Sequence, residues 1–170
     1  CRHCLHPLPE GLTVAREIDF DGVDDYLEQL GNFFAQSTVL EADAKLKEAT
    51  PAQTGRLRAS WQIGENAISE ASEKPGQYPE AQGSNIPDMK GVNYQPGTET
   101  IGNVYSIHNA VEYAEPVCMG TGLPPSWGGS FKTRQGTVPG FPELITKELQ
   151  VDSQRRFNDA VKQAQKKGKI

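Results

Sequence analysis

Thr50-Pro51-Ala52-Gln53-Thr54-Gly55-Arg56-Leu57-Arg58-Ala59-Ser60-Trp61 is the stretch that decides the fold, because it ends one element, turns and begins another. Pro51 cannot continue a helix that arrives from the N-terminal side, and Gly55 can adopt the positive φ that a chain reversal needs. From Leu57 onward apolar and polar residues alternate, which predicts a strand over residues 57–63. The apolar face carries Leu57, Ala59, Trp61 and Ile63, and the other face carries Arg56, Arg58, Ser60 and Gln62.

Helical spacing precedes this junction. One apolar stripe contains Val23, Leu27, Leu30 and Phe34, and a second stripe contains Val39, Ala42, Leu46 and Ala49. The two stripes belong to one long helix that begins near Asp21, but they are rotated by roughly a quarter turn relative to each other. This rotation predicts a bend or a local rewinding of the helix between Phe34 and Val39.

The rest of the chain predicts a second strand and a second long helix. Ile101, Tyr105 and Ile107 alternate within a strand over residues 101–108, and a helix begins near Pro142 and continues to Ala164. We therefore expect an α+β fold, with a small and mainly antiparallel sheet covered by a long N-terminal helix and a C-terminal helix.

The expected organisation is a single domain over residues 21–165, with an extended arm before it (1–20) and a basic tail after it (166–170). Two tracts rich in Gly and Pro, residues 64–100 and 120–140, interrupt the domain. The first is either a functional loop or an arm that a partner orders. The second carries Trp127 and Phe131, which either form a contact surface or fold back over the domain's own core.

Composition favours a subunit that completes its burial against neighbours. The chain has 170 residues, of which 36% are hydrophobic, with 17 Gly and 12 Pro. That length suits one core, and the absence of a run of about eighteen apolar residues argues against a membrane span. We expect a soluble protein from a reducing compartment, because three cysteines cannot all pair.

Four possible soft-metal ligands lie together at the N-terminus, namely Cys1, His3, Cys4 and His6. Zinc is bound by such atoms, but structural zinc sites separate two ligand pairs by a folded segment of about a dozen residues or more. We therefore favour an arm that is flexible or docked on a partner over a zinc site, and we expect no metal or other cofactor.

The junction resembles that of the tail-completion, or neck, family of tailed bacteriophages. In that family a long helix runs into a Thr-Pro-x-x-Thr-Gly-x-Leu-Arg-x-Ser type sequence. The resemblance continues in Tyr105-Ser106-Ile107-His108-Asn109-Ala110-Val111-Glu112-Tyr113-Ala114, where the family has a strand, an Asn and a Tyr-Ala pair before a glycine-rich turn. Here Gly120-Thr121-Gly122 takes the place of that turn. In element order, the likeness covers residues 21–165.

This resemblance implies a structural virion protein located at the neck, where head and tail join, and assembled in the cytoplasm of the bacterial host. Copies would form a homo-oligomeric ring through head-to-tail contacts whose rotation closes. A hexamer is favoured and a dodecamer is the alternative. The ring would join the portal-side connector to the tail and let genomic DNA pass, while its loops and N-terminal arm reach the adjacent rings.

Charge is distributed unevenly along the chain. Residues 1–50 carry ten acidic and four basic side chains, a balance of −6, whereas residues 150–170 carry six basic and two acidic ones, a balance of +4. The two regions offer a contact between copies, or with another acidic ring, and a solvated cationic helix end is the alternative. The net charge of −5 disfavours tight binding of nucleic-acid phosphates, which suits a conduit for DNA better than a DNA reader.

Arg56 and Arg58 are the exception to this balance. They either line a lumen and touch passing phosphate, or lie at a subunit boundary and pair with Glu112 or Glu115 of a neighbouring copy. We favour the boundary, because the planar guanidinium group suits carboxylates.

Three other functions stay open. One is a tail-terminator ring that caps the tail tube, and another is a small binding module of non-viral or prophage origin. The third is a hydrolase in which His108, Glu112 and Cys118 act as base, orienting group and nucleophile. We do not expect an enzyme, because no phosphate-binding glycine loop or His-Glu-x-x-His motif occurs and the strand pattern turns His108 toward solvent or an interface.

Overall fold

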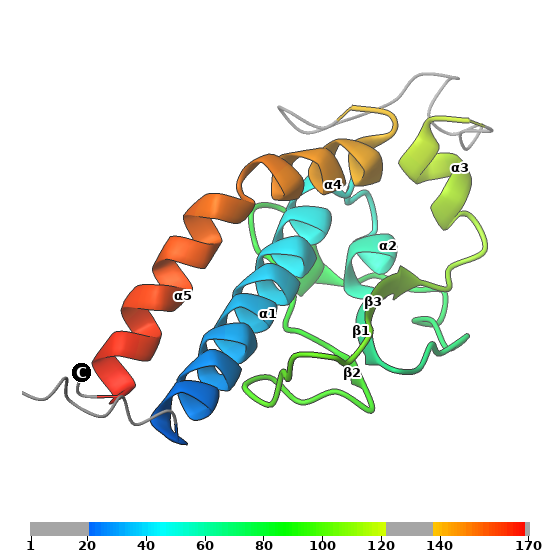
Figure 1. Cartoon of the computed structure of the whole chain (residues 1–170). Coiled ribbons are helices and arrows are strands. Elements are labelled where there is room, and N and C mark those ends of the chain that lie inside the picture. The colour runs from blue at the N-terminus through cyan, green and yellow to red at the C-terminus, as the bar shows by residue number, and fades with distance from the viewer. Residues whose placement is uncertain (1–20, 122–137, 169–170) are drawn as a thin grey trace, which may run out of the picture.

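The computed structural model describes residues 21–121 and 138–168, and its fold is α+β, as predicted (Figure 1). Its elements are α1 (Asp21–Ala49), α2 (Arg56–Ala59), β1 (Trp61–Glu65), the 3-10 helix η1 (Pro79–Ala81), β2 (Gly91–Val92), β3 (Tyr105–Asn109), α3 (Ala114–Met119), α4 (Phe141–Val151) and α5 (Ser153–Gly168). In Figure 1, α5 lies alongside α1, α4 lies at the C-terminal end of α1, and the sheet lies on the other side of α1 from α5.

The sheet has three strands in the order β2-β1-β3. β1 and β3 pair antiparallel along their whole length, from Trp61 opposite Asn109 to Glu65 opposite Tyr105. β2 is short and pairs in parallel with β1, so the sheet is mixed although its longer pairing is antiparallel, as expected. The second predicted strand begins late, because residues 101 and 102 form a turn and only Tyr105 and Ile107 lie in β3.

α1 is one uninterrupted α-helix, so of the two predicted alternatives, a bend or a local rewinding between Phe34 and Val39, the rewinding is wrong. The two apolar stripes point in different directions because they meet different partners. Leu30 lies in a cluster with two alanines of α5, whereas Val39 packs with Ile63 of β1. Between the stripes, the hydroxyls of Ser37 and Thr38 donate to the Phe34 carbonyl at 3.0 and 2.8 Å, which satisfies these polar side chains within the helix.

The strand predicted over residues 57–63 is also wrong in its first half. Gly55 takes φ of +80° and begins the short helix α2, and the extended chain starts only at Trp61. A Cβ atom at Gly55 would lie 2.4 Å from the Tyr78 carbonyl oxygen, so both the dihedral angle and the close backbone approach require glycine. Because residues 56–59 form one helical turn, both arginines point inward. In a strand they would lie on an outer face.

The predicted C-terminal helix is two helices, because the chain changes direction at Asp152. Phe141 and Ile145 of α4 complete a buried cluster with Leu46, Trp61 and Cys118. At the break, the buried Arg156 of α5 donates to the Leu149 carbonyl of α4. This hydrogen bond joins the last turn of α4 to the first turn of α5 across the corner between the two helices.

The long tract between β1 and β3 folds onto the domain itself. Ala81 is completely buried, and Tyr94 and Glu99 are also buried. Tyr94 packs edge-to-face with Tyr105 of β3, with ring centroids 6.1 Å apart. Over its described length this tract is therefore part of the folded domain, which argues against an arm that only a partner orders.

Candidate functional site

Arg58 lies inside the molecule, with 1% of its surface exposed. Its Nε and Nη2 atoms donate to the Thr50 carbonyl at 3.2 and 2.6 Å, and Nη1 donates to the Gly83 carbonyl at 3.1 Å. Nη2 also reaches the Glu48 carbonyl at 3.3 Å. The expectation that this side chain faces a lumen or a neighbouring copy is therefore wrong: it joins the end of α1 to the segment that follows η1.

Arg56 forms a bidentate ion pair with Glu112, with N–O distances of 2.9 and 3.1 Å. Its Nε donates to the Glu73 carbonyl at 2.7 Å, and its guanidinium carbon lies 5.5 Å from the centre of the Tyr113 ring. The hydrogen bonds from Arg56 lower the pKa of Glu112. The predicted pairing of these two residues thus occurs within one chain instead of across a subunit boundary. Arg56 is buried, while the Glu112 side chain remains 69% exposed.

The two sequence segments that carry the resemblance meet in space. The side-chain amide of Asn109 donates to the Leu57 carbonyl at 2.8 Å. Leu57 also belongs to a buried cluster with Val111, Ala114 and Val117. The Arg56–Glu112 pair lies beside this cluster, so α2, β3 and the start of α3 form one unit held by a hydrogen bond, an ion pair and apolar contacts.

The other predicted contact residues have different outcomes. Glu115 lies in the first turn of α3 and is exposed. Trp127 and Phe131 lie outside the described residues, as do Cys1, His3, Cys4 and His6. Within residues 21–121 and 138–168, no group of three or more His, Cys, Asp or Glu side chains could hold a metal ion.

The three residues of the hydrolase alternative are each engaged elsewhere. His108 accepts a hydrogen bond at Nε2 from the Ser69 backbone N–H at 3.1 Å, so its face of β3 is covered by the chain that follows β1. Glu112 is paired with Arg56. Cys118 lies in the buried apolar cluster around Trp61, and burial raises the pKa of its thiol to about 11. A neutral, packed thiol is a poor nucleophile.

A buried ion pair on α1 supports the tract between β1 and β3. Lys47 and Asp43, one turn apart on α1, are 2.8 Å apart at their charged atoms and both are buried. Lys47 also donates to the Asp88 carbonyl at 3.3 Å, just before β2. Burial raises the pKa of Asp43, although the hydrogen bond to Lys47 opposes this shift. The pair therefore acts as an internal attachment for the segment that leads into β2.

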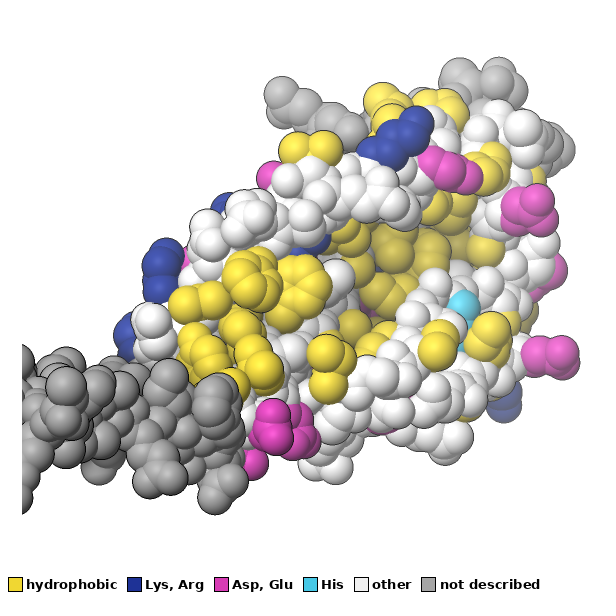
Figure 2. All heavy atoms as spheres, in the orientation of Figure 1, with side chains coloured by type: hydrophobic (Ala, Val, Ile, Leu, Met, Phe, Trp, Pro, Cys, Tyr) yellow, Lys and Arg dark blue, Asp and Glu magenta, His cyan; other side chains and the backbone are white. Residues whose placement is uncertain are grey.

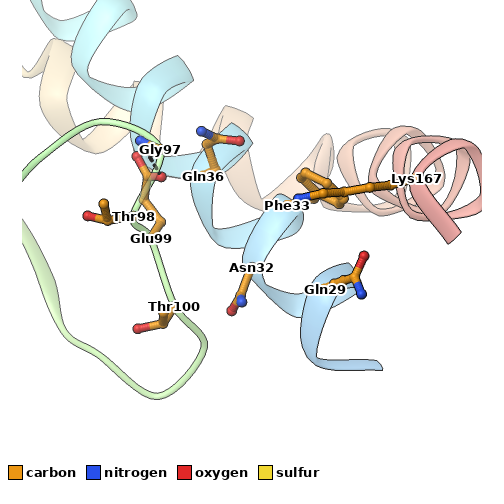
Figure 3. A pocket seen from close by; sticks show the side chains of 9 residues that line it. All are labelled: Gln29, Asn32, Phe33, Gln36, Gly97, Thr98, Glu99, Thr100 and Lys167. Carbon is orange, nitrogen blue, oxygen red and sulfur yellow. Dashed lines mark hydrogen bonds between the residues drawn. The ribbon is translucent and has the colours of Figure 1, made fainter. Parts of the chain in front are cut away.

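A cavity of about 180 Å³ lies between α1 and residues 97–100 (Figure 3). Three amide side chains of α1, those of Gln29, Asn32 and Gln36, line one wall. Lys167 of α5 closes one end, with its ammonium group 5.5 Å from the Phe33 ring centre. Sequence reasoning missed this cavity, although amides spaced three and four residues apart on one helix predict a polar face. Such a lining can hydrogen-bond a polar ligand or a peptide backbone, and it offers no activated nucleophile.

A second exposed region on α1 is a large apolar surface. Figure 2 shows hydrophobic side chains gathered over the N-terminal half of α1, next to α5 and to the loop before β3. Its exposed members are Val23, Leu27, Ile101 and Phe157, which we call the α1 apolar surface. Ile101 rests on Gly31, where an added Cβ atom would lie 2.8 Å from the Ile101 Cδ1 atom. None of the described helices is long and apolar enough to cross a membrane.

No family model, no curated protein and no solved structure matches this chain. The geometry therefore carries the functional argument together with the sequence resemblance. The structure has a unit of α2, β3 and the start of α3 that is held together around the junction. It also has two exposed regions on α1, of which one is the polar cavity and the other is the α1 apolar surface.

Proposed function

We propose that the chain is a structural subunit of the neck of a tailed bacteriophage, forming a ring that joins the head-side connector to the tail. The observation that carries this proposal is the meeting of the two segments that resemble the neck family. They are separated by more than forty residues in sequence, yet Asn109 bonds to Leu57 and Arg56 pairs with Glu112. The resemblance therefore rests on two segments that belong to one structural unit, which supports the proposal.

The orientation of the two arginines supports a passage that does not hold DNA. Arg58 is buried on backbone carbonyls, and Arg56 is neutralised by Glu112. Neither guanidinium group is therefore offered to a phosphate backbone. Because the net charge is also −5, these two arginines do not give a wall built from this chain a basic surface that would release counterions and grip DNA.

Exposed apolar residues in two separate places support a subunit with several neighbours. One is the α1 apolar surface, and the other is the outer face of α4, where Leu144 is 49% and Val151 is 81% exposed. Monomeric soluble proteins seldom expose extended apolar areas without a partner for them. A ring subunit between a connector and a tail needs contacts with copies of itself and with both adjacent rings.

Solution mass and electron microscopy of the full chain would test this function. The purified protein would be examined alone and after mixing with purified connectors and with purified tails of the phage that encodes it. We expect ring-shaped particles that bind both. A protein that stays monomeric and binds neither would refute the proposal, and binding to tails alone would replace the neck role with that of a tail terminator.

A further inference from the structure

An acidic flank lies on the N-terminal half of α1. It consists of Asp24, Asp25 and Glu28, all exposed. At about 100° per residue, these three side chains lie on the side of α1 opposite to the one that faces α5. The residues that face α5 are Tyr26, Leu30, Phe33 and Phe34. No ion pair joins the acidic flank to any residue of the described chain.

A basic flank lies on the outer side of α5. Lys162 and Lys166 are exposed and point away from Ala160 and Ala164, the buried alanines that contact α1. Lys162 pairs only with Asp159 on its own helix, at 3.0 Å, within the described residues. An exposed pair of this kind contributes little and is readily exchanged for a better partner. The two flanks therefore lie on opposite sides of the helical layer formed by α1 and α5.

Exposed apolar side chains accompany the acidic flank. Leu27 and Ile101, which are 54% and 65% exposed, lie next to the acidic flank. Phe157 of α5 is 43% exposed, but it lies on the side of that helix that faces α1 and packs edge-to-face on Phe34, with ring centroids 6.2 Å apart. The acidic flank thus combines charges of one sign with uncovered apolar groups, as the centre and rim of a protein interface do.

We propose that these flanks form the contact between neighbouring copies of this chain. The acidic flank of one copy, with Leu27 and Ile101, meets the basic flank of the next copy. Opposite charges on opposite sides of one chain make a head-to-tail contact complementary, whereas two acidic flanks or two basic flanks repel. This inference rests on the proposed function, because a head-to-tail contact whose rotation closes generates a ring.

Charge reversal on each flank tests this contact. One variant is Asp24→Lys with Glu28→Lys, and the other is Lys162→Glu with Lys166→Glu. Each variant alone places like charges at every contact, so we expect about a tenfold or greater rise in the protein concentration needed for assembly. Mixing the two variants restores opposite charges at every contact in an alternating ring, so we expect assembly to return. Sedimentation velocity measures both effects.

A matched control reverses two other exposed acids, Glu70→Lys with Glu80→Lys. It changes the net charge by the same amount as the Asp24 and Glu28 variant, but both of its residues lie outside the flanks. We expect this control to assemble like the wild type. The inference is overturned if the wild type forms rings and the flank variants do so equally well, or if the mixture fails to assemble. A wild type that stays monomeric at every concentration overturns this contact and removes support for the proposed function as well. Circular dichroism of each variant confirms that it is folded.

Discussion

Arg58 shows how a residue that looks like a surface contact in the sequence becomes part of the interior. It donates hydrogen bonds to carbonyl groups of Thr50, Ala81 and Gly83, which belong to two segments of chain distant in sequence. The Thr50 hydroxyl in turn accepts from the Trp61 indole N–H at 2.8 Å. A buried guanidinium group offers five donors in a fixed plane, and a lysine cannot reproduce that arrangement.

Replacing Arg58 by lysine should therefore lower the free energy of unfolding strongly. Arg58→Lys keeps the charge but leaves buried carbonyls without donors, and we expect a loss of about 3 kcal/mol. Chemical denaturation followed by tryptophan fluorescence measures it, because Trp61 is buried next to the site. The control is Arg155→Lys, whose side chain is 54% exposed, with an expected change below about 0.5 kcal/mol. Equal effects of the two substitutions would contradict the internal role of Arg58.

The Arg56–Glu112 pair should make stability depend on pH. Because Arg56 lowers the pKa of Glu112, the pair stabilises the fold fully above the ordinary carboxyl pKa of 4.5. This contribution is lost as the pH falls through the lowered value in the folded protein. We therefore expect Glu112→Gln to be less stable than the wild type at neutral pH, and the difference to vanish in acid. Denaturation at several pH values measures this.

The same substitution in an Arg56→Met background provides the control for the pH experiment. Without its guanidinium partner, Glu112 has no reason to stabilise the fold, so Glu112→Gln should then have no effect at any pH. A difference of the same size in both backgrounds would show that Glu112 acts through something other than Arg56.

At the level of elements, the long tract between β1 and β3 determines whether the domain folds alone. It supplies the buried Ala81, the β2 strand and the carbonyls that Arg58 uses. Lys47 of α1 attaches this tract to the helix by donating to the Asp88 carbonyl. A tract with these attachments is a structural part of the domain even though its Gly and Pro content is typical of a loop.

Replacing residues 75–97 by a short Gly-Ser linker should consequently abolish cooperative unfolding. The change removes Ala81, β2 and Tyr94, and it leaves the buried Arg58 without two of its acceptors. Near-ultraviolet circular dichroism and thermal unfolding would show this. A linker variant that keeps a cooperative transition and native near-ultraviolet signals would mean that the tract is an accessory loop.

Element type was predictable where periodicity is local. The stripes of α1 and the alternation of Tyr105 and Ile107 each arise from residues close in sequence. The junction was not predictable to the same extent, because four alternating residues fit one helical turn as well as a strand. What decides between them is the set of acceptors for Arg58, which come from segments up to 25 residues away. The break at Asp152 has a similar origin, since the cap on α4 comes from Arg156.

For the candidate site, the sequence analysis correctly named Glu112 as a partner of Arg56, but it placed the two residues in different copies of the chain. No pattern in one chain distinguishes an intramolecular ion pair from an intermolecular one, because both need only opposite charges at suitable positions. The polar cavity beside α1 escaped prediction for a related reason. Its second wall, residues 97–100, is brought to α1 by the fold of the middle tract.

Across the whole molecule, charge and apolar exposure are organised around the α1–α5 layer. Acidic side chains lie on one flank, basic side chains on the other, and the α1 apolar surface lies next to both (Figure 2). Electrostatic attraction between exposed groups weakens with salt, whereas burial of apolar area does not. If copies meet through both kinds of group, removing either kind should reduce assembly while the single chain stays folded.

The apolar half of the contact can be tested by Leu27→Gln with Ile101→Gln. Both side chains are more than half exposed, so the substitutions cost the isolated chain little, and the Ile101 backbone N–H keeps its hydrogen bond to the Asn32 side chain. In the assembled ring they would place two polar groups in a dry contact, and we expect assembly to require about tenfold more protein.

Sedimentation velocity at several protein concentrations measures this loss, with unchanged thermal unfolding as evidence of an intact fold. Ile68→Gln is the control, because Ile68 is 70% exposed but lies in the chain that follows β1, outside both flanks. Assembly of the Leu27 and Ile101 variant at wild-type concentrations would show that the α1 apolar surface is not part of the contact between copies. Making an apolar group polar must weaken an association that buries this group.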